Sequence, residues 1–373
     1  MRKQLNVIDL FCGAGGLSYG FAKNKNFNLI CGVDNDINMT TTYEKNHPDS
    51  KVFTMDISGL TREFFEENTN YKVSDVDILV GGPPCQAYST LGRAKLSTNG
   101  RDIMDDPRGK LFQEYYRLLQ LFEPKFFIFE NVRGLLSMGK GQLVKQIVNL
   151  FEELGYDVQL PVLNAKDYGV PQHRNRIIIT GTLNKEKKFE YPKPTHGESP
   201  LLPYVTFRDA TSDLPEIGNN DSADFYKTEP QTDYQRWLRQ NASDVLTEYY
   251  YPKNSERLIN FMNLAKEGGS ILDFPEDIRP KKSFNNSYSR LWWDKPSTTI
   301  TSNLGSPSSA RCVHPSSCRA LTTREGARLQ SYPDDYIFIG SRGSKNLQIG
   351  NSVPPLLAIA LADSLEKYFN EDD

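Results

Sequence analysis

The feature that most constrains the fold is an alternation of short apolar runs with helix-like stretches over the first 130 residues. The apolar runs have the length of β-strands, and the stretches between them carry apolar residues at helical spacing. Apolar strands separated by helices are typical of parallel sheets covered on both faces. The pattern therefore predicts an α/β fold with a doubly wound, mostly parallel sheet. The predicted strands are residues 5–11, 27–34, 51–57, 75–82 and 125–132.

The pattern changes in the second half of the chain. Residues 156–165 and 175–182 are predicted to form an antiparallel hairpin at the sheet edge, because the two runs are so close in sequence. A stretch rich in proline begins near residue 191 and leads into irregular sequence up to about residue 318. We therefore expect an α/β domain over 1–190, a small irregular domain over 191–318, and a segment over 319–373 that completes the first domain.

Composition excludes several classes of protein. No apolar run is long enough to span a bilayer, and the first residues lack the pattern of a signal peptide, so an intracellular protein without a membrane partner is expected. The five cysteines include no CxxC pair and the four histidines no HxxxH pair, so neither a disulfide framework nor a metal site is predicted. With a net charge of −3, binding to nucleic acid would require a local basic face.

A glycine-rich turn follows the first predicted strand in DLFCGAGGLS, residues 9–18. Glycines permit positive φ and the close approach of a ligand, although Ser18 stands where a dinucleotide-binding turn has its third glycine. Asp34 ends the second strand at the distance typical of a ribose-binding acid, and Asp56 ends the third strand, where it could accept from an adenine amino group. Together these positions predict a nucleoside site. They do not distinguish NAD from S-adenosylmethionine, and each alone also fits a ligand-free turn or a solvated carboxylate.

A lone cysteine follows the fourth predicted strand in GGPPCQAYS, residues 81–89. Pro83 and Pro84 stiffen the backbone before Cys85 and can hold its side chain in one direction. Glu130 ends the fifth strand, next along the same rim, so a thiol and a carboxylate could flank a small planar substrate. The simpler alternatives are a structural cysteine and a salt-bridged acid.

The ordered motifs resemble those of cytosine-5 DNA methyltransferases of the bacterial restriction–modification type. They cover most of the chain outside about 190–285, and many short patterns in one order are far more specific than any single one. They are DLFCGAGGLS, Asp34, MDI, GGPPCQAYS, DDPRGKLF, FENV, LNAKDYGVPQHRNRI, LTTREGARLQSYPDDY and IGNSVPP.

The resemblance implies a Rossmann-like methyltransferase fold, with S-adenosylmethionine as cofactor and Cys85 as the nucleophile that attacks carbon 6 of cytosine. It implies that Glu130 holds the cytosine ring and that Arg174 and Arg176 support the base and the thiol. The residues implied to bind the cofactor are Phe11, Gly13, Gly15, Gly16, Asp34, Asn35, Asp56, Ile57, Pro84, Leu111, Asn351 and Ser352.

The resemblance also implies how DNA is bound. Residues 191–318 would be the target-recognition domain, and the long polar loop 89–109 would close over DNA while the target base is flipped out. The expected contacts to DNA are Arg93, Lys95, Arg101, Lys281 and Lys282. The expected partners are double-stranded DNA and a cognate restriction endonuclease, and the protein is expected to be a monomer in the bacterial cytoplasm, on the nucleoid when it acts.

Three positions depart from the commoner family pattern. Asn35 replaces a larger side chain that stacks on adenine in many relatives, Asp34 replaces Glu, and Tyr88 replaces Phe. Three alternative functions fit the sequence less well. A tRNA cytosine methyltransferase would carry a Cys-Phe-Thr segment, which is absent. A DNA-binding protein with a dead catalytic site would not need Cys85 and Glu130. A nicotinamide oxidoreductase leaves QHRNR unexplained.

Overall fold

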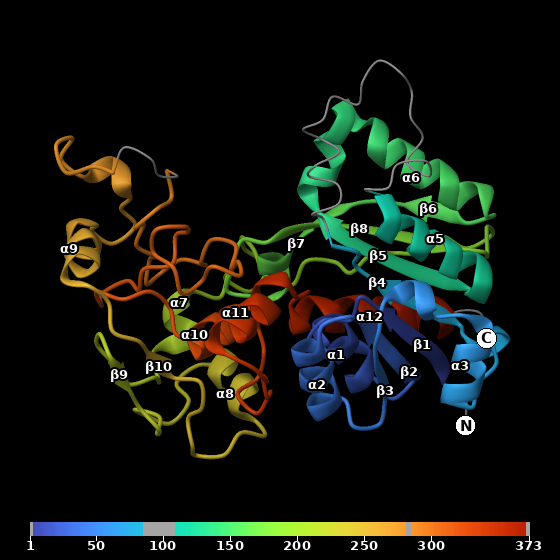
Figure 1. Ribbon diagram of the computed structural model, residues 1–373, viewed down its shortest axis with the longest axis horizontal. Coiled ribbons are helices and arrows are strands. Elements are labelled where there is room, and N and C mark those ends of the chain that lie inside the picture. Colours follow the sequence, from blue (N-terminus) through green and yellow to red (C-terminus); the bar gives the residue numbers. More distant parts are fainter. Residues whose placement is uncertain (1–2, 85–108, 281–284, 371–373) are drawn as a thin grey trace. The chain divides into compact units, whose positions relative to one another are not determined.

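The computed structural model describes residues 3–84, 109–280 and 285–370 (Figure 1). Two compact units can be distinguished. The sheet unit comprises residues 1–164, 175–193 and 358–373, and the loop-rich unit comprises residues 165–174 and 194–357.

The sheet unit is built on a mixed sheet with strand order β3-β2-β1-β4-β5-β8-β6, in which β7 also pairs with β8. Strands β1 to β5 run parallel, and β8 pairs antiparallel with β5, β6 and β7. The predicted doubly wound, mostly parallel sheet is confirmed. The strands are β1 (Leu5–Leu10), β2 (Phe27–Asp34), β3 (Lys51–Thr54), β4 (Ile78–Gly81), β5 (Phe126–Val132), β6 (Asp157–Gln159), β7 (Val162–Asn164) and β8 (Asn175–Thr182).

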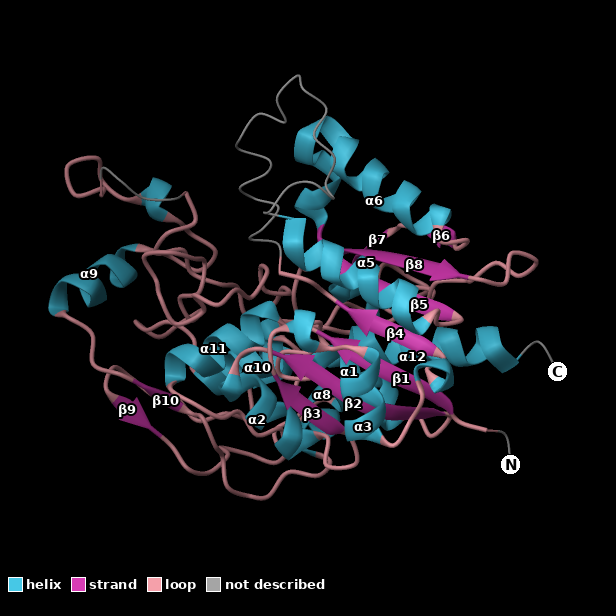
Figure 2. Ribbon diagram, turned by 45° about the vertical axis from the view of Figure 1, so that its right-hand side comes forward, coloured by secondary structure: helices cyan, strands magenta, loops and turns pink. Residues whose placement is uncertain are grey.

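Helices cover both faces of this sheet (Figure 2). On β5, alternate side chains face opposite layers, as strand geometry requires. Phe127 packs on Phe151 of α6, whereas Phe126 packs on Tyr368 of α12. Each of these fully buried aromatic rings contributes about 1.5–3 kcal/mol of hydrophobic stabilisation. The helices are α1 (Gly16–Lys23), α2 (Ile37–Asn46), α3 (Arg62–Thr69), α5 (Lys110–Phe122), α6 (Gln142–Glu153) and α12 (Pro355–Asn370, in this unit from Ala358), with 3₁₀ segments η1 (Ile57–Gly59), η2 (Val73–Asp75) and η4 (Arg133–Gly141).

Two predicted strands are shorter than expected. The run 156–165 forms the separate strands β6 and β7, because Pro161 between them has no N–H to donate to a ladder. The run 51–57 ends as a strand at Thr54, because the Asp56 side chain accepts from the Ser58 amide at 2.9 Å and begins η1 instead. Asp56 therefore lies two residues beyond the strand end.

The loop-rich unit contains short helices joined by long loops, as the irregular sequence predicts. Residues 319–357, expected to rejoin the α/β domain, cluster here, since α10 packs against α7 and α11. The assignment of catalytic and recognition roles to regions of the chain stays a prediction. The elements are α7 (Phe207–Thr211), α8 (Asp233–Arg239), α9 (Glu256–Leu264), α10 (Thr323–Leu329), α11 (Arg342–Asn351), η5 (Ala165–Tyr168), η6 (Ile271–Asp273), and the ribbon β9 (Asp221–Ser222) with β10 (Tyr250–Tyr251). Among all helices that the structure describes, none has the length and apolarity needed to cross a bilayer.

Buried charge holds the loop-rich unit together. Arg328 of α10 is fully buried and pairs with Asp213 and, at 2.6 Å, with Asp334. Arg319 forms two 2.8 Å hydrogen bonds to the carboxylate of Glu325, which is equally buried. Buried ions lose hydration, so each depends on its partner to remain charged in the interior.

We expect Asp334→Ala to lower the free energy of unfolding by about 3–5 kcal/mol, because it leaves Arg328 buried with part of its charge unpaired. Asp294→Ala is the matched control. It breaks an Arg–Asp pair at 2.6 Å whose side chains are 51% and 72% exposed, and such pairs contribute at most about 1 kcal/mol. Urea unfolding followed by circular dichroism measures both changes, and equal effects would contradict the importance of the buried pair.

The same unit should lose stability in acid. Burial alone would raise the pKa of Glu325, but the charge and hydrogen bonds of Arg319 outweigh it and lower the pKa to about 2. Since an unfolded glutamate has a higher pKa, this stabilisation is complete above about pH 4.5 and is lost as the pH falls toward 2. Urea midpoints measured from pH 2 to 6 should fall more steeply for the wild type than for Glu325→Gln, which has no carboxyl group to protonate.

Candidate active site

The glycine-rich turn connects β1 to α1 at the edge where the parallel strands end. Strand order reverses here, with β1 between β2 and β4, and such a switch point is where open α/β sheets bind ligands. Phe11, Gly13 and Gly15 have φ values of 56°, 53° and 83°, so the backbone folds into a left-handed turn. The Cys12 amide donates to Val33 at 3.1 Å, which fixes the turn to β2.

Asp34 holds this turn from the end of β2. Its Oδ2 accepts from the Gly13 amide at 2.9 Å, and its Oδ1 accepts from the Asp36 amide at 3.0 Å. Burial raises the pKa of Asp34, and the two amide bonds oppose that shift. The structure therefore brings Asp34 and the glycines together, as the sequence predicts, and adds a structural role for the carboxylate that the sequence did not reveal.

The residues around the turn differ in exposure. Asp56 is exposed, and its hydrogen bonds from the Ser58 hydroxyl and amide lower the pKa of its carboxyl. Ile57 is buried, and its carbonyl accepts from Arg117 of α5. Gly16 begins α1, Asn35 and Pro84 are exposed, and Leu111 packs at the margin of the apolar core.

A buried ion pair lies on the neighbouring strands β5 and β8. Arg176 Nε is 2.8 Å from Glu130 Oε1, with both side chains less than 15% exposed, a pairing that the sequence did not reveal. The pair lies against the segment that leads to Cys85, since a Cβ added at Gly82 would be 2.8 Å from Glu130 Oε2. The next residue, Asn131, donates to the Pro83 carbonyl at 3.1 Å and anchors the same segment. Among these residues, Asn131 was missed by sequence reasoning.

Arg174 belongs to the loop-rich unit, and its contacts there differ from those expected. Its fully buried guanidinium donates to the carbonyls of Ile300, Gly350 and Ser352 at 2.7–2.9 Å. It thereby supports the backbone on both sides of Asn351, the exposed last residue of α11. Support of the cytosine by Arg174 stays a prediction.

Two glutamines, which sequence reasoning also missed, bind the same backbone. Gln172 accepts from the Ile300 amide at 3.0 Å and donates to the Leu329 carbonyl at 2.7 Å. Gln330 donates to the carbonyls of Ile349 and Ser352. Only the polar character of QHRNR and LQSY could have pointed to these residues, because their partners are far away in sequence.

Comparison with known proteins identifies the family. The family model of the C-5 cytosine-specific DNA methylases matches residues 5–367. The chain belongs to this family. Type II methyltransferase M1.HphI of Haemophilus parahaemolyticus is 35% identical, over 97% of this chain and 87% of its own. Type II methyltransferase M.DdeI of Desulfomicrobium norvegicum is 36% identical, over 98% and 89% respectively. The protein is thus an enzyme, a C-5 cytosine DNA methyltransferase of the type II restriction–modification class.

Solved structures agree with the fold. A prophage-encoded E. coli protein assigned as a DNA modification methyltransferase has a TM-score of 0.76 at 26% identity, covering 98% of this chain and 100% of its own. The S. pombe Dnmt2 methyltransferase has a TM-score of 0.60 at 18% identity, covering 98% and 99%. At that identity the second likeness shows the fold alone.

Several predicted site residues of the methyltransferase lie outside the described residues, namely Cys85, Arg93, Lys95, Arg101, Lys281 and Lys282. Of the cysteines that the structure describes, Cys12, Cys31 and Cys312 are buried, and burial raises the pKa of each thiol. Because the thiolate is the nucleophile, these three are poorly suited to covalent catalysis at neutral pH.

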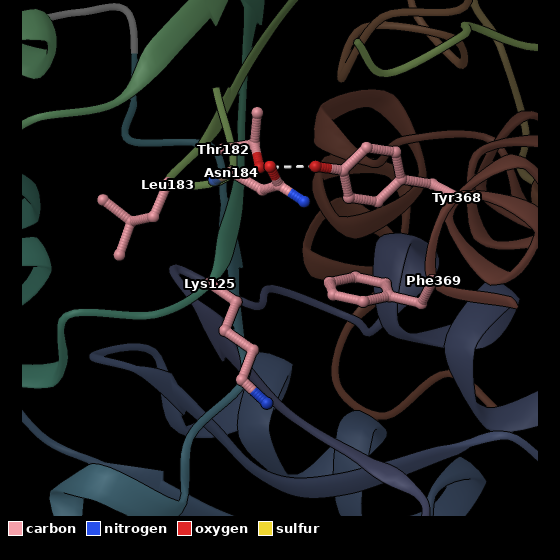
Figure 3. Close-up of a pocket in the computed structure, with 6 residues that line it drawn as sticks. All are labelled: Lys125, Thr182, Leu183, Asn184, Tyr368 and Phe369. Atoms are coloured by element: carbon pink, nitrogen blue, oxygen red, sulfur yellow. Dashed lines mark hydrogen bonds between the residues drawn. The ribbon is translucent and has the colours of Figure 1, made fainter. Parts of the chain in front are cut away.

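A separate pocket lies at the opposite edge of the sheet. Lys125 precedes β5 and Thr182 ends the antiparallel β8. The pocket therefore lies where β5 begins, whereas Glu130 lies near the end of that strand (Figure 3). It has a volume of about 470 Å³ and is also lined by Leu183, Asn184, Tyr368 and Phe369. It takes no part in the candidate active site.

Arg176→Ala should lower kcat/KM for DNA methylation by about 100-fold, because the substitution removes the charged partner of Glu130. Arg62→Ala, which removes an exposed arginine 3.7 Å from Glu66 on α3, is the matched control and should leave kcat/KM unchanged. Steady-state incorporation of labelled methyl groups into DNA measures both. Equal activities of the two variants would contradict a role for the ion pair.

Proposed function

We propose that the enzyme transfers a methyl group from S-adenosylmethionine to carbon 5 of a flipped-out cytosine in a specific double-stranded DNA sequence, through a covalent adduct of Cys85. The observation that carries the proposal is the buried Glu130–Arg176 pair against Gly82, three residues before Cys85. It places a buried carboxylate, paired with an arginine, beside the segment that leads to the proposed nucleophile.

The glycine turn suits the cofactor. Positive φ at Gly13 and Gly15 opens the backbone to a ligand, and Asp34, fixed by two amides, can accept further hydrogen bonds from a ribose diol. Bound S-adenosylmethionine would supply an electrophilic methyl group on a sulfonium sulfur. The residues proposed to hold it are Phe11, Gly13, Gly15, Gly16, Asp34, Asn35, Asp56, Ile57, Pro84, Leu111, Asn351 and Ser352.

Glu130 would recognise the cytosine ring. When it carries a proton, the carboxyl group can donate to the ring nitrogen and accept from the amino group of cytosine at once, while Arg176 pairs with its other face. As charge builds on the ring during attack, a group fixed in advance stabilises it without reorganising.

Cys85 would make carbon 5 reactive. Its thiolate forms a bond to carbon 6, and the electron pair of the 5,6 double bond makes carbon 5 carbanion-like. Carbon 5 would then take the methyl group as the bond from the methyl carbon to the sulfonium sulfur breaks, which leaves S-adenosylhomocysteine. Loss of the carbon-5 proton to a base restores the double bond and expels the Cys85 thiolate, so the enzyme is regenerated.

DNA must be opened for this chemistry, because carbon 6 is inaccessible inside a duplex. We propose that Arg93, Lys95 and Arg101 contact phosphates after flipping, and that Lys281 and Lys282 bind the backbone beside the recognition site. The named type II relatives support a cognate restriction endonuclease acting on the same sequence. We propose that the enzyme acts as a monomer.

Trapping on modified DNA tests the proposal. Duplex DNA of diverse sequence containing 5-fluorocytosine should form a denaturation-resistant adduct in the presence of S-adenosylmethionine, because fluorine cannot leave carbon 5 as a proton does. Cys85→Ala should abolish the adduct, and gel electrophoresis with peptide mapping measures it. Cys318→Ala, which removes another thiol that the structure leaves unbridged, should form the adduct normally.

Three outcomes would contradict the proposal. An adduct that persists in Cys85→Ala would assign the nucleophile elsewhere. An adduct on fluorocytosine-substituted tRNA and none on DNA would make tRNA the substrate. Tight DNA binding without any adduct or methylation would indicate a binding protein with an inactive site.

A further inference from the structure

Ser18 occupies the position at which a dinucleotide-binding turn has its third glycine. It is the third residue of α1 and is fully buried. Glycine at that position allows a helix to pack closely on its strand, whereas a serine brings a hydroxyl that must find partners in the interior. The Ser18 hydroxyl finds these partners in Asp9 and Tyr43.

The Ser18 hydroxyl joins three elements of the sheet unit. It donates to Asp9 Oδ2 of β1 at 2.6 Å and lies 3.0 Å from the Tyr43 hydroxyl of α2. A serine hydroxyl has one proton, so when Asp9 is ionised Ser18 donates to Asp9 and accepts from Tyr43. The result is a buried chain of hydrogen bonds from α2 through α1 to β1.

Helix α2 also contacts the turn at a second point. His47, which caps α2, has Nε2 3.2 Å from the Gly15 carbonyl. The Tyr43 ring lies against β2, where a Cβ added at Gly32 would be 2.7 Å from it. Since Tyr43 has so little freedom, its hydroxyl is a fixed point from which Ser18 can be held.

We propose that Ser18 is a positioning residue for the cofactor: by linking Asp9 to Tyr43, its hydroxyl fixes the start of α1 and the glycine turn in the geometry that binds S-adenosylmethionine. This inference rests on the proposed function, because it assumes that the turn holds the cofactor.

The hydrogen-bond chain also depends on charge. Burial raises the pKa of Asp9 to about 7, while the Ser18 hydrogen bond opposes the shift and the charge of Asp34 adds to it. Protonated Asp9 can donate to Ser18, which then donates to Tyr43, so the chain can reverse near neutral pH. The other titratable groups that act on Asp9 or on the turn are Cys12, Cys31, Tyr43 and Tyr115, whose pKa values burial raises, and His47, whose pKa burial lowers to about 4.

Cofactor binding by the full-length enzyme tests the inference, with unreactive S-adenosylhomocysteine as the probe. Calorimetry from pH 6 to 8.5 should give a Kd about tenfold higher for Ser18→Ala, as expected for the loss of one hydrogen bond to a charged group. The KM for DNA should not change. The inflection of Kd with pH should move to higher pH in Ser18→Ala, because a bond that lowers the pKa of Asp9 is gone, and should vanish in Asp9→Asn.

Tyr43→Phe and Tyr368→Phe form a matched pair. Each removes one buried phenol hydroxyl from the sheet unit, and that of Tyr368 lies 2.7 Å from the Thr182 hydroxyl at the far edge of the sheet (Figure 3). Tyr43→Phe should raise the Kd for S-adenosylhomocysteine severalfold, and Tyr368→Phe should leave it unchanged although both lower the melting temperature.

The outcomes separate the two proposals. If the wild type binds the probe and methylates DNA, but Ser18→Ala and Tyr43→Phe bind it within twofold of the wild type with an unchanged pH profile, Ser18 is structural only and the inference is overturned. If the wild type neither binds the probe nor methylates DNA, the proposed function itself fails. If Ser18→Ala does not fold, Tyr43→Phe and Asp9→Asn decide, and wild-type binding profiles for both would overturn the inference.

Discussion

The carboxylate of Asp34 is the constraint on which the candidate site depends. A turn with three positive φ values is intrinsically unfavourable, above all at Phe11, which is not a glycine. Asp34 offsets this by accepting the Gly13 amide, while its second oxygen fixes the start of α2 through Asp36. One side chain at the end of β2 thus sets the direction in which both α1 and α2 leave the sheet.

The antiparallel strand β8 has a comparable role for the Glu130–Arg176 pair. A further parallel strand beside β5 would require a crossover connection, whereas β8 enters the sheet from the rim itself. Arg176, at the beginning of β8, therefore lies opposite Val132 at the end of β5 and reaches back to Glu130. The salt bridge is a direct result of strand direction, and it explains why an arginine motif so late in the chain can serve a carboxylate on the fifth strand.

Local rules predicted the fold of the sheet unit and the positions of Asp34 and Glu130, because strand periodicity places strand ends and the ends of parallel strands share one edge. They failed where a partner is far away in sequence. Arg174 lies in the same motif as Arg176, yet its partners are carbonyls more than 100 residues away, and no pattern in QHRNR distinguishes the two arginines.

The position of residues 319–357 was also not predictable from local sequence. They look like ordinary helical sequence, and only the buried ion pairs of α10 show that they belong to the loop-rich unit. Asp56 was misplaced by two residues because a capping interaction ended the strand early.

The all-buried helix α10 has a consequence for how this unit can change in sequence. Arg319, which precedes the helix, pairs with Glu325 inside it, and Arg328 pairs with Asp334 beyond its end and with Asp213 more than 100 residues earlier in the chain. Exchange of any one of these residues removes a partner from at least one buried charge, so tolerated replacements are expected in matched sets. Exposed side chains of the connecting loops, such as Phe225 and Val245, are uncharged and can be replaced without leaving a buried charge unpaired. We therefore expect amino-acid substitutions to be tolerated less often at the buried ion pairs of this unit than in its exposed loops.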